Sequence, residues 1–223
     1  MGKREEALSA YGNAIAQSPF EAHLAIAGFH RVEGDTTARL HHLFAASEAD
    51  TSRFEPWLDI AEIHEAQSAF ADAASAYPEV KRRNPGLDGL LAKIGAAYAK
   101  SGKPAEAVSV YEEWVSRDPS SATALFNLAV TYDALGRHDK AIEKYREAIA
   151  IQVGFADAHL NLAIDLLDRK AFDEALDAYL AYLECAKPGQ EAHTDRGDRR
   201  QAQDCARTLV NCYTENKKKE SQS

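Results

Sequence analysis

The sequence predicts an all-α protein in which similar helix pairs stack along the chain. Alanine, the strongest helix former, makes up roughly a fifth of the residues, whereas glycine (12) and proline (7) are sparse. Apolar residues recur with a period of 34, and each period contains two runs with helical spacing. No alternating β-branched run stands out, so no sheet is expected.

Composition excludes several classes of protein. The 223 residues are 45% hydrophobic and 27% charged, which suits a chain with a proper core. No apolar stretch approaches the ~20 residues of a membrane span. The net charge of −9 argues against duplex nucleic acid as a partner. Three cysteines without a CxxC pair indicate neither a disulfide framework nor a zinc ribbon, and they favour a cytoplasmic location.

The 34-residue period defines five units. Tyrosines recur at this interval at Tyr77, Tyr111, Tyr145 and Tyr179. Alanines recur at Ala73, Ala107, Ala141 and Ala175. Turn glycines fit the same frame at Gly34, Gly102 and Gly136. The units are therefore expected at 20–53, 54–87, 88–121, 122–155 and 156–189.

Each unit is expected to form two helices. In unit 122–155 one helical face carries Leu125, Leu128, Ala129 and Tyr132, and a second carries Ala141, Tyr145, Ala148 and Ile149. The alanines at the eighth and twentieth positions allow the paired helices to touch. One such pair cannot bury its apolar faces alone, so neighbouring units must stack.

These residues resemble the tetratricopeptide repeat (TPR) family. The first half of its motif is similar to Trp57-x2-Ile60-Ala61-x2-His64, to Leu91-x2-Ile94-Gly95-x2-Tyr98 and to Leu125-x2-Leu128-Ala129-x2-Tyr132. The resemblance implies a right-handed superhelical solenoid of antiparallel helix pairs. Unit 20–53 departs from the motif, with Arg39 in place of the small residue and Thr51 in place of the proline.

The two ends are expected to differ from the repeats. Residues 1–19 match only the second helix of a unit, so either the chain is truncated upstream or a lone helix caps the array, and this end is a candidate for self-association. Residues 190–214 are expected to form a polar linker and a C-terminal capping helix. Residues 215–223 are expected to be a disordered tail.

No pattern indicates catalysis. Nucleophile, dinucleotide, phosphate-loop and zinc-protease motifs are missing from the sequence, so we expect no enzyme, no cofactor and no metal site. His30 and His64 occupy core positions of their units and are expected to pack. His41 and His42 are adjacent and do not share a helix face, so joint chelation is not expected.

The resemblance implies that the first helix of each unit lines a concave groove. Asn127 and Asn161 occupy the same position of successive units, and amides in series are similar to the ladders that hold a peptide backbone in some TPR proteins. The apolar floor beside them is expected to consist of Phe126, Val130, Leu160, Ile164 and Leu167. Asp59 and Glu62, with Lys93, are expected to make the other end charged and to favour a basic stretch of the ligand.

The leading functional interpretation is a non-enzymatic protein–protein interaction module that binds a partner peptide or helix in the groove. One alternative is a regulatory or targeting array of a larger protein, possibly an enzyme, truncated upstream of Met1. Another is a self-assembling structural scaffold. Nucleic acid and membrane partners are not expected.

Overall fold

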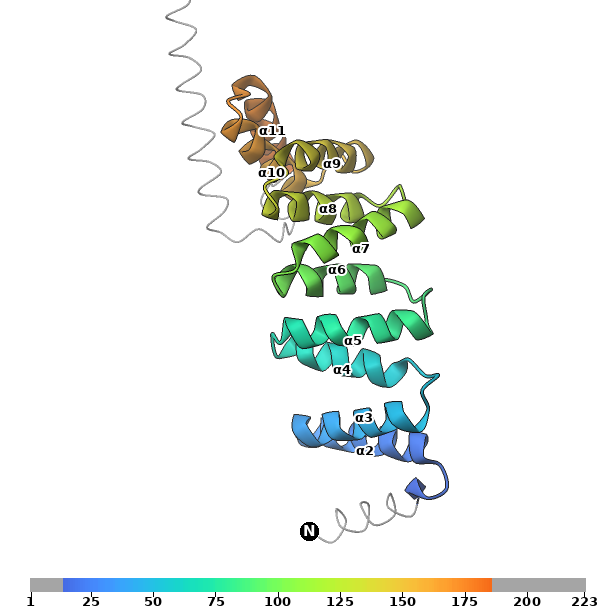
Figure 1. The fold of residues 1–223 in the computed structure, drawn as a ribbon. Coiled ribbons are helices and arrows are strands. Elements are labelled where there is room, and N and C mark those ends of the chain that lie inside the picture. The colour runs from blue at the N-terminus through green and yellow to red at the C-terminus, as the bar shows by residue number, and fades with distance from the viewer. Residues whose placement is uncertain (1–13, 186–223) are drawn as a thin grey trace, which may run out of the picture. The chain divides into compact units, whose positions relative to one another are not determined.

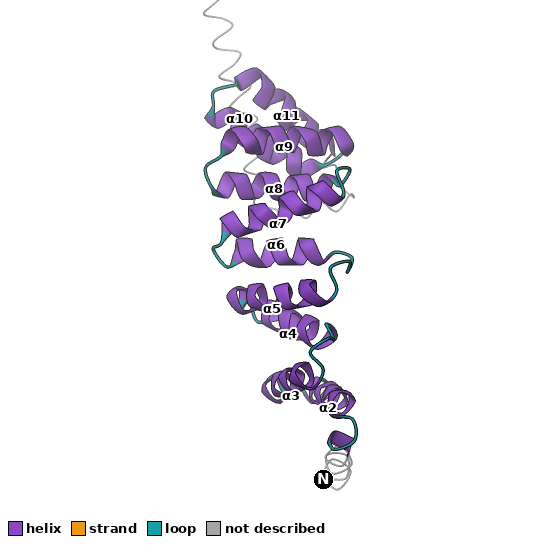
Figure 2. Cartoon of the chain, turned by 45° about the vertical axis from the view of Figure 1, so that its right-hand side comes forward, coloured by secondary structure: helices purple, strands orange, loops and turns teal. Residues whose placement is uncertain are grey.

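The all-α prediction is confirmed. The computed structural model describes residues 14–185, and this part of the chain forms ten α-helices and no strand (Figures 1 and 2). Most of the incomplete N-terminal unit, as well as the expected linker, capping helix and tail, lies outside these described residues.

The helices follow one another through short turns. Their bounds are α2 Pro19–Glu33, α3 Thr36–Ala49, α4 Glu55–Ala66, α5 Phe70–Arg83, α6 Leu90–Lys100, α7 Pro104–Arg117, α8 Ala122–Ala134, α9 His138–Ile151, α10 Ala156–Asp168 and α11 Phe172–Cys185. The chain divides between Ala107 and Val108, inside α7, into two compact parts that each hold several of the 34-residue repeats. From here on, the first unit and the second unit mean these two parts.

In the first unit, α2 packs on α3 and α4 packs on α5. Between pairs, α3 contacts α4 and α5 contacts α6. Leu43, Ile60 and Tyr77 are almost fully buried along this stack. Helix α5 continues through Pro78, which has no backbone N–H to donate within the helix.

The second unit repeats this packing: α8 packs on α9, α9 on α10 and α10 on α11. The alanines at the helix contacts, Ala129, Ala141, Ala163 and Ala175, have no exposed surface. Tyr145, Tyr179 and Tyr182 are likewise buried. Small side chains at the contacts and tyrosines beside them therefore form the core of this unit.

The turn inside each helix pair has the same backbone conformation. Its left-handed residue has φ of +76° at Gly34, +58° at Ser68, +77° at Gly102, +68° at Gly136 and +61° at Lys170. These positions are 34 apart, so serine and lysine adopt a conformation that favours glycine.

Replacing Lys170 by glycine is therefore expected to stabilise the protein by about 0.5–1 kcal/mol, because the left-handed strain of lysine exceeds the extra entropy that glycine loses on folding. Urea unfolding followed by circular dichroism measures the change. The matched control is Gly136→Ala, which should destabilise: no atom lies within 4 Å of the added Cβ, so backbone strain alone acts there. A destabilised Lys170→Gly variant would contradict the strain argument.

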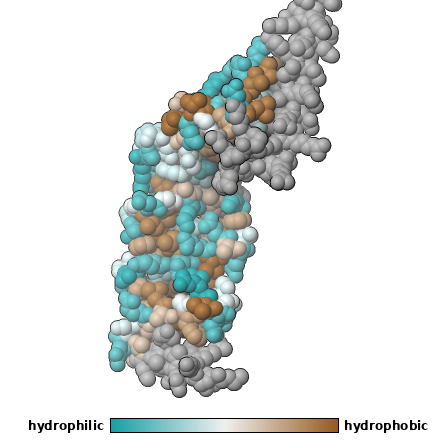
Figure 3. All heavy atoms as spheres, turned by 180° about the vertical axis from the view of Figure 1, so that it is seen from behind, coloured by the Kyte–Doolittle hydropathy of each residue, from teal (hydrophilic) through white to brown (hydrophobic). Residues whose placement is uncertain are grey.

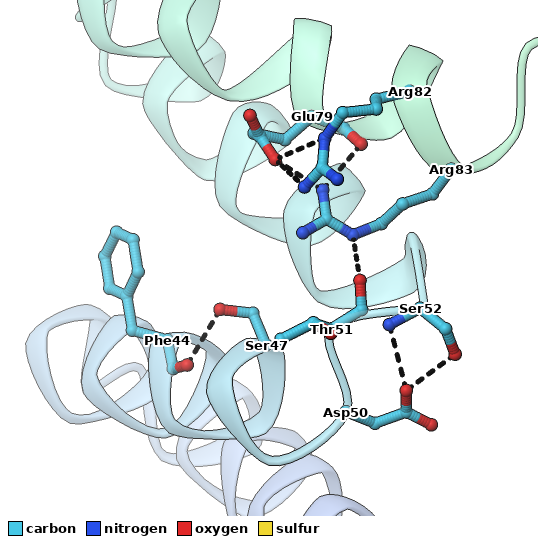
Figure 4. A network of polar contacts seen from close by, with 8 residues as sticks. All are labelled: Phe44, Ser47, Asp50, Thr51, Ser52, Glu79, Arg82 and Arg83. Atoms are coloured by element: carbon cyan, nitrogen blue, oxygen red, sulfur yellow. Dashed lines mark hydrogen bonds and ion pairs between the residues drawn. The ribbon is translucent and has the colours of Figure 1, made fainter.

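An arginine ties the divergent repeat to its neighbour in the first unit (Figure 4). Arg83 on α5 donates from Nε to the backbone oxygen of Thr51 at 2.8 Å, and its Nη1 donates to both the carboxylate and the backbone carbonyl of Glu79. The Arg83 side chain is only 6% exposed and lies over the ring of Trp57. This contact fastens the loop after α3, where unit 20–53 lacks the usual proline.

Candidate peptide-binding surface

Two amides and two exposed apolar side chains lie at matching positions of α8 and α10. Asn127 and Asn161 are half-buried, and 34 residues separate them. Three residues further along each helix, Val130 is 39% exposed and Ile164 is 45% exposed. Each helix thus presents one amide and one large apolar side chain in the same arrangement.

The remaining members of the expected apolar floor are less accessible. Leu160 is buried, with 8% of its surface exposed. Phe126 is half-buried because it packs against Phe155, with ring centroids 4.8 Å apart, and against Tyr145 at 5.9 Å. Leu167 is half-buried. Leu160 and Phe126 therefore support the surface from below, and Val130 and Ile164 are its accessible apolar members.

Asn161 is also part of an internal polar chain. Its Nδ2 donates to the Tyr145 hydroxyl at 3.3 Å, and that hydroxyl donates to Asp133 Oδ2 at 2.6 Å. Burial, followed by the hydrogen bond to Asp133, raises the pKa of Tyr145 well above its usual range. These hydrogen bonds fix the orientation of the Asn161 amide, and the second hydrogen of its NH2 group is left for a ligand.

The same tyrosine–acid bond occurs in the first unit. Tyr77 donates to Glu65 Oε2 at 2.5 Å, with the same 12-residue separation as Tyr145 and Asp133. Glu65 and Asp133 thus hold the buried tyrosine of their own helix pair. The sequence analysis did not connect either acid to its tyrosine.

The charged residues expected at the other end of the groove are paired with one another. Arg39 donates to Asp59 at 3.1 Å, and Lys93 Nζ lies 2.6 Å from Glu62 Oε1. Arg39 stands where the motif has a small side chain, and its charge is balanced by the ion pair with Asp59. These four charges cancel, and the attraction of a basic ligand to this end is reduced.

Three titratable side chains converge near the end of α8, and we call them the Asp–His–Asp cluster: Asp133, His138 and Asp165. His138 Nδ1 lies 3.2 Å from Asp165 Oδ1 and 3.4 Å from Asp133 Oδ1. Burial, together with the nearby Asp133 carboxylate, raises the pKa of Asp165, and His138 opposes this. Their spacings of 5 and 27 residues fit no ligand motif, but Asp165 on a buried helix face was a usable signal.

A second cluster of imidazoles lies between α2 and α3. His23 Nδ1 is 3.0 Å from His42 Nδ1, and His30 stacks on His42 with ring centroids 5.6 Å apart. Burial, followed by the neighbouring histidines, lowers the pKa of His23 and of His42. The partner of His42 is therefore His23 on the neighbouring helix, whereas sequence reasoning considered only the adjacent His41.

A cavity of about 430 Å³ opens between α9, α10 and α11. Leu162 and Leu166 line it together with alanines of α9 and α11, and Arg146 and Glu174 form an ion pair at its edge. None of the residues expected in the peptide site lines this cavity.

Figure 3 shows one face of the molecule, on which hydrophobic residues form separate patches between hydrophilic ones. None of the described helices is long and apolar enough to span a membrane.

The fold and a family match define the class of protein. Residues 93–153 match the family model described as tetratricopeptide repeat. The helix pairs, the 34-residue period and the buried alanine contacts continue the same pattern beyond the matched residues. Each of the two units is accordingly a stack of TPR-type helix pairs.

Solved structures show the same fold at low sequence identity. A crystal structure of MamA protein is 21% identical, with a TM-score of 0.67 over 79% of this chain and 98% of that chain. YrrB, described as a TPR protein with an unusual peptide-binding site, is 16% identical, with a TM-score of 0.64 over 81% and 94%. A tetratricopeptide repeat protein from Parabacteroides merdae is 18% identical, with a TM-score of 0.63 over 75% and 66%. No curated protein matches the chain.

Proposed function

We propose that this chain is a non-enzymatic protein-interaction module that holds an extended partner peptide on the α8 and α10 surface. The observation that carries the proposal is the repetition of one amide and one exposed apolar residue, Asn127 with Val130 and Asn161 with Ile164. Large exposed apolar side chains invite association, and an amide beside each one offers a donor and an acceptor to a peptide bond.

The TPR fold and its likeness to YrrB support this class of function. A peptide in extended form places successive backbone groups along the surface, so its amides would bond to Asn127 and Asn161 whatever its sequence. Its apolar side chains would cover Val130 and Ile164, with Phe126 and Leu167 at the margin. The paired charges of Asp59 and Glu62 give the first unit a smaller part in the proposal.

The test is the double variant Asn127→Ala with Asn161→Ala. Loss of buried backbone bonds is expected to weaken peptide binding by about 1–3 kcal/mol while helicity is retained. A random peptide library displayed on phage is selected on the parent protein, and the affinity of the enriched peptides for both proteins is measured by isothermal titration calorimetry.

The matched control is Gln67→Ala with Gln152→Ala, which removes two exposed amides elsewhere and should leave binding unchanged. The Asn161 change also removes the bond to Tyr145, so thermal unfolding of each variant is recorded alongside. Enriched peptides that bind the asparagine double variant as tightly as the parent would place the interaction surface elsewhere.

A further inference from the structure

The Asp–His–Asp cluster combines residues from three successive elements of the second unit. Asp133 lies in the last turn of α8, His138 is the first residue of α9, and Asp165 lies on the inner face of α10. The left-handed turn at Gly136 brings the start of α9 back to the end of α8. The packing of α10 on α9 then adds Asp165 to this pair.

The cluster leaves two buried acceptors without a donor. Asp133 Oδ1 and Asp165 Oδ2 are both inaccessible, and neither has a hydrogen-bond partner among the described residues. Asp165 is only 5% exposed as a residue. Burying a carboxylate oxygen without a partner is costly, so the arrangement calls for a positive charge between the two carboxylates, either a proton that Asp165 shares with Asp133 or a bound cation.

The spacing of the candidate ligand atoms suits one metal ion. The candidate ligand atoms, one from each of the three residues, lie within 4.8 Å of one another. Two ligand atoms that each bind an ion at about 2.1 Å are about 3.0 Å apart in octahedral geometry and about 3.4 Å apart in tetrahedral geometry. The separations of His138 Nδ1 from the two carboxylates, 3.2 and 3.4 Å, lie in this interval.

We propose that Asp133, His138 and Asp165 bind a divalent first-row transition-metal ion of the Zn²⁺ type. One imidazole nitrogen and two carboxylates match the ligand preferences of such ions, whereas Mg²⁺ and Ca²⁺ prefer oxygen ligands alone. A neutral His138 and two carboxylates carry the charge that one divalent ion balances. The His138 side chain is 47% exposed, so water completes the coordination from the open side.

The residues behind the cluster have the arrangement of an outer shell. The Tyr145 hydroxyl holds Asp133 Oδ2 at 2.6 Å, and Asn161 in turn holds that hydroxyl. Such partners orient a ligating carboxylate and raise the affinity of a metal site. A bound ion would also connect α8, α9 and α10, and it would stabilise the second unit by mass action.

The experiment is a titration of the full-length chain with Zn²⁺, followed by calorimetry and by the imidazole signals in NMR spectra. Because His23 and His42 offer a competing pair of nitrogens, every protein carries His42→Gln. His138→Gln and Asp165→Asn are each expected to lower the affinity for one equivalent of Zn²⁺ by about tenfold or more. The matched control is Asp168→Asn, an exposed acid on the same helix that should bind Zn²⁺ as the parent does.

Two further readings decide the outcome. The imidazole signals of His138 are identified as those missing from the spectrum of His138→Gln, and Zn²⁺ is expected to shift them. Zn²⁺ is also expected to raise the Tm of the parent but not that of Asp165→Asn. His138 is exposed, so its glutamine variant should fold, and circular dichroism checks this. Equal Zn²⁺ binding by the parent and both site variants, or unshifted His138 signals at saturating Zn²⁺, would overturn the proposal in favour of a proton shared between Asp133 and Asp165.

Discussion

Replacing Leu128 by alanine is expected to lower the free energy of unfolding by about 2–5 kcal/mol. Leu128 lies on α8 and is 2% exposed, so the substitution removes buried apolar surface and leaves a cavity that the packed helices fill only in part. Urea unfolding of the full chain, followed by circular dichroism at 222 nm as a general helix signal, measures the change.

Leu180→Ala is the control for this prediction, since Leu180 is a leucine on α11 that is 49% exposed. Its loss should change stability by about 0.5 kcal/mol or less. If Leu128→Ala unfolds at the same urea concentration as Leu180→Ala, the conclusion that the inner face of α8 is buried is wrong.

The second large effect is expected from adding volume at a helix contact. Ala141 on α9 has no exposed surface, and it occupies the position where the helices of each pair touch. Ala141→Leu should therefore separate α8 from α9 and cost several kcal/mol, at or above the upper end of the ~1–3 kcal/mol typical of overpacking.

Ala150→Leu tests the same change on the exposed side of the same helix, where it should be nearly neutral. Both variants are compared with the parent by thermal and urea unfolding. A fully stable Ala141→Leu protein would show that the sequence-derived helix register is wrong.

The candidate surface was only partly predictable from sequence. Asn127 and Asn161 share a repeat position, and the structure leaves Val130 and Ile164 exposed beside them. Leu160 was expected on the same surface and is buried, because its exposure depends on how α10 packs against its neighbours. Spacing along one helix identifies a face, but it does not say which neighbouring helix covers that face.

The charged residues show the same limit. Asp59 and Glu62 were identified as groove residues, yet Arg39 and Lys93, which pair with them, lie 20 and 31 residues away. Asp133 and Tyr145 are 12 residues apart in the sequence, but their hydrogen bond depends on the distance between two packed helices. The Arg39–Asp59 and Lys93–Glu62 pairs are at different repeat positions, so the 34-residue period gives no signal for them.

The sequence by itself determined the helix pairs, their order and their turns. A period of 34 with alanine and tyrosine at fixed positions reports local backbone preference and burial, which every repeat must satisfy in the same way. The same period located the turn glycines Gly34, Gly102 and Gly136, and the structure shows the same left-handed backbone at Ser68 and Lys170.

Only the tertiary structure decided which side chains meet. Asp133, His138 and Asp165 come from different helices and from non-equivalent repeat positions, and they converge because α10 packs on α9. The cluster depends on angles and separations between packed helices, which are set by the sum of many contacts. For this reason the repeat pattern predicted the scaffold, while the polar clusters became visible only once the helices were packed.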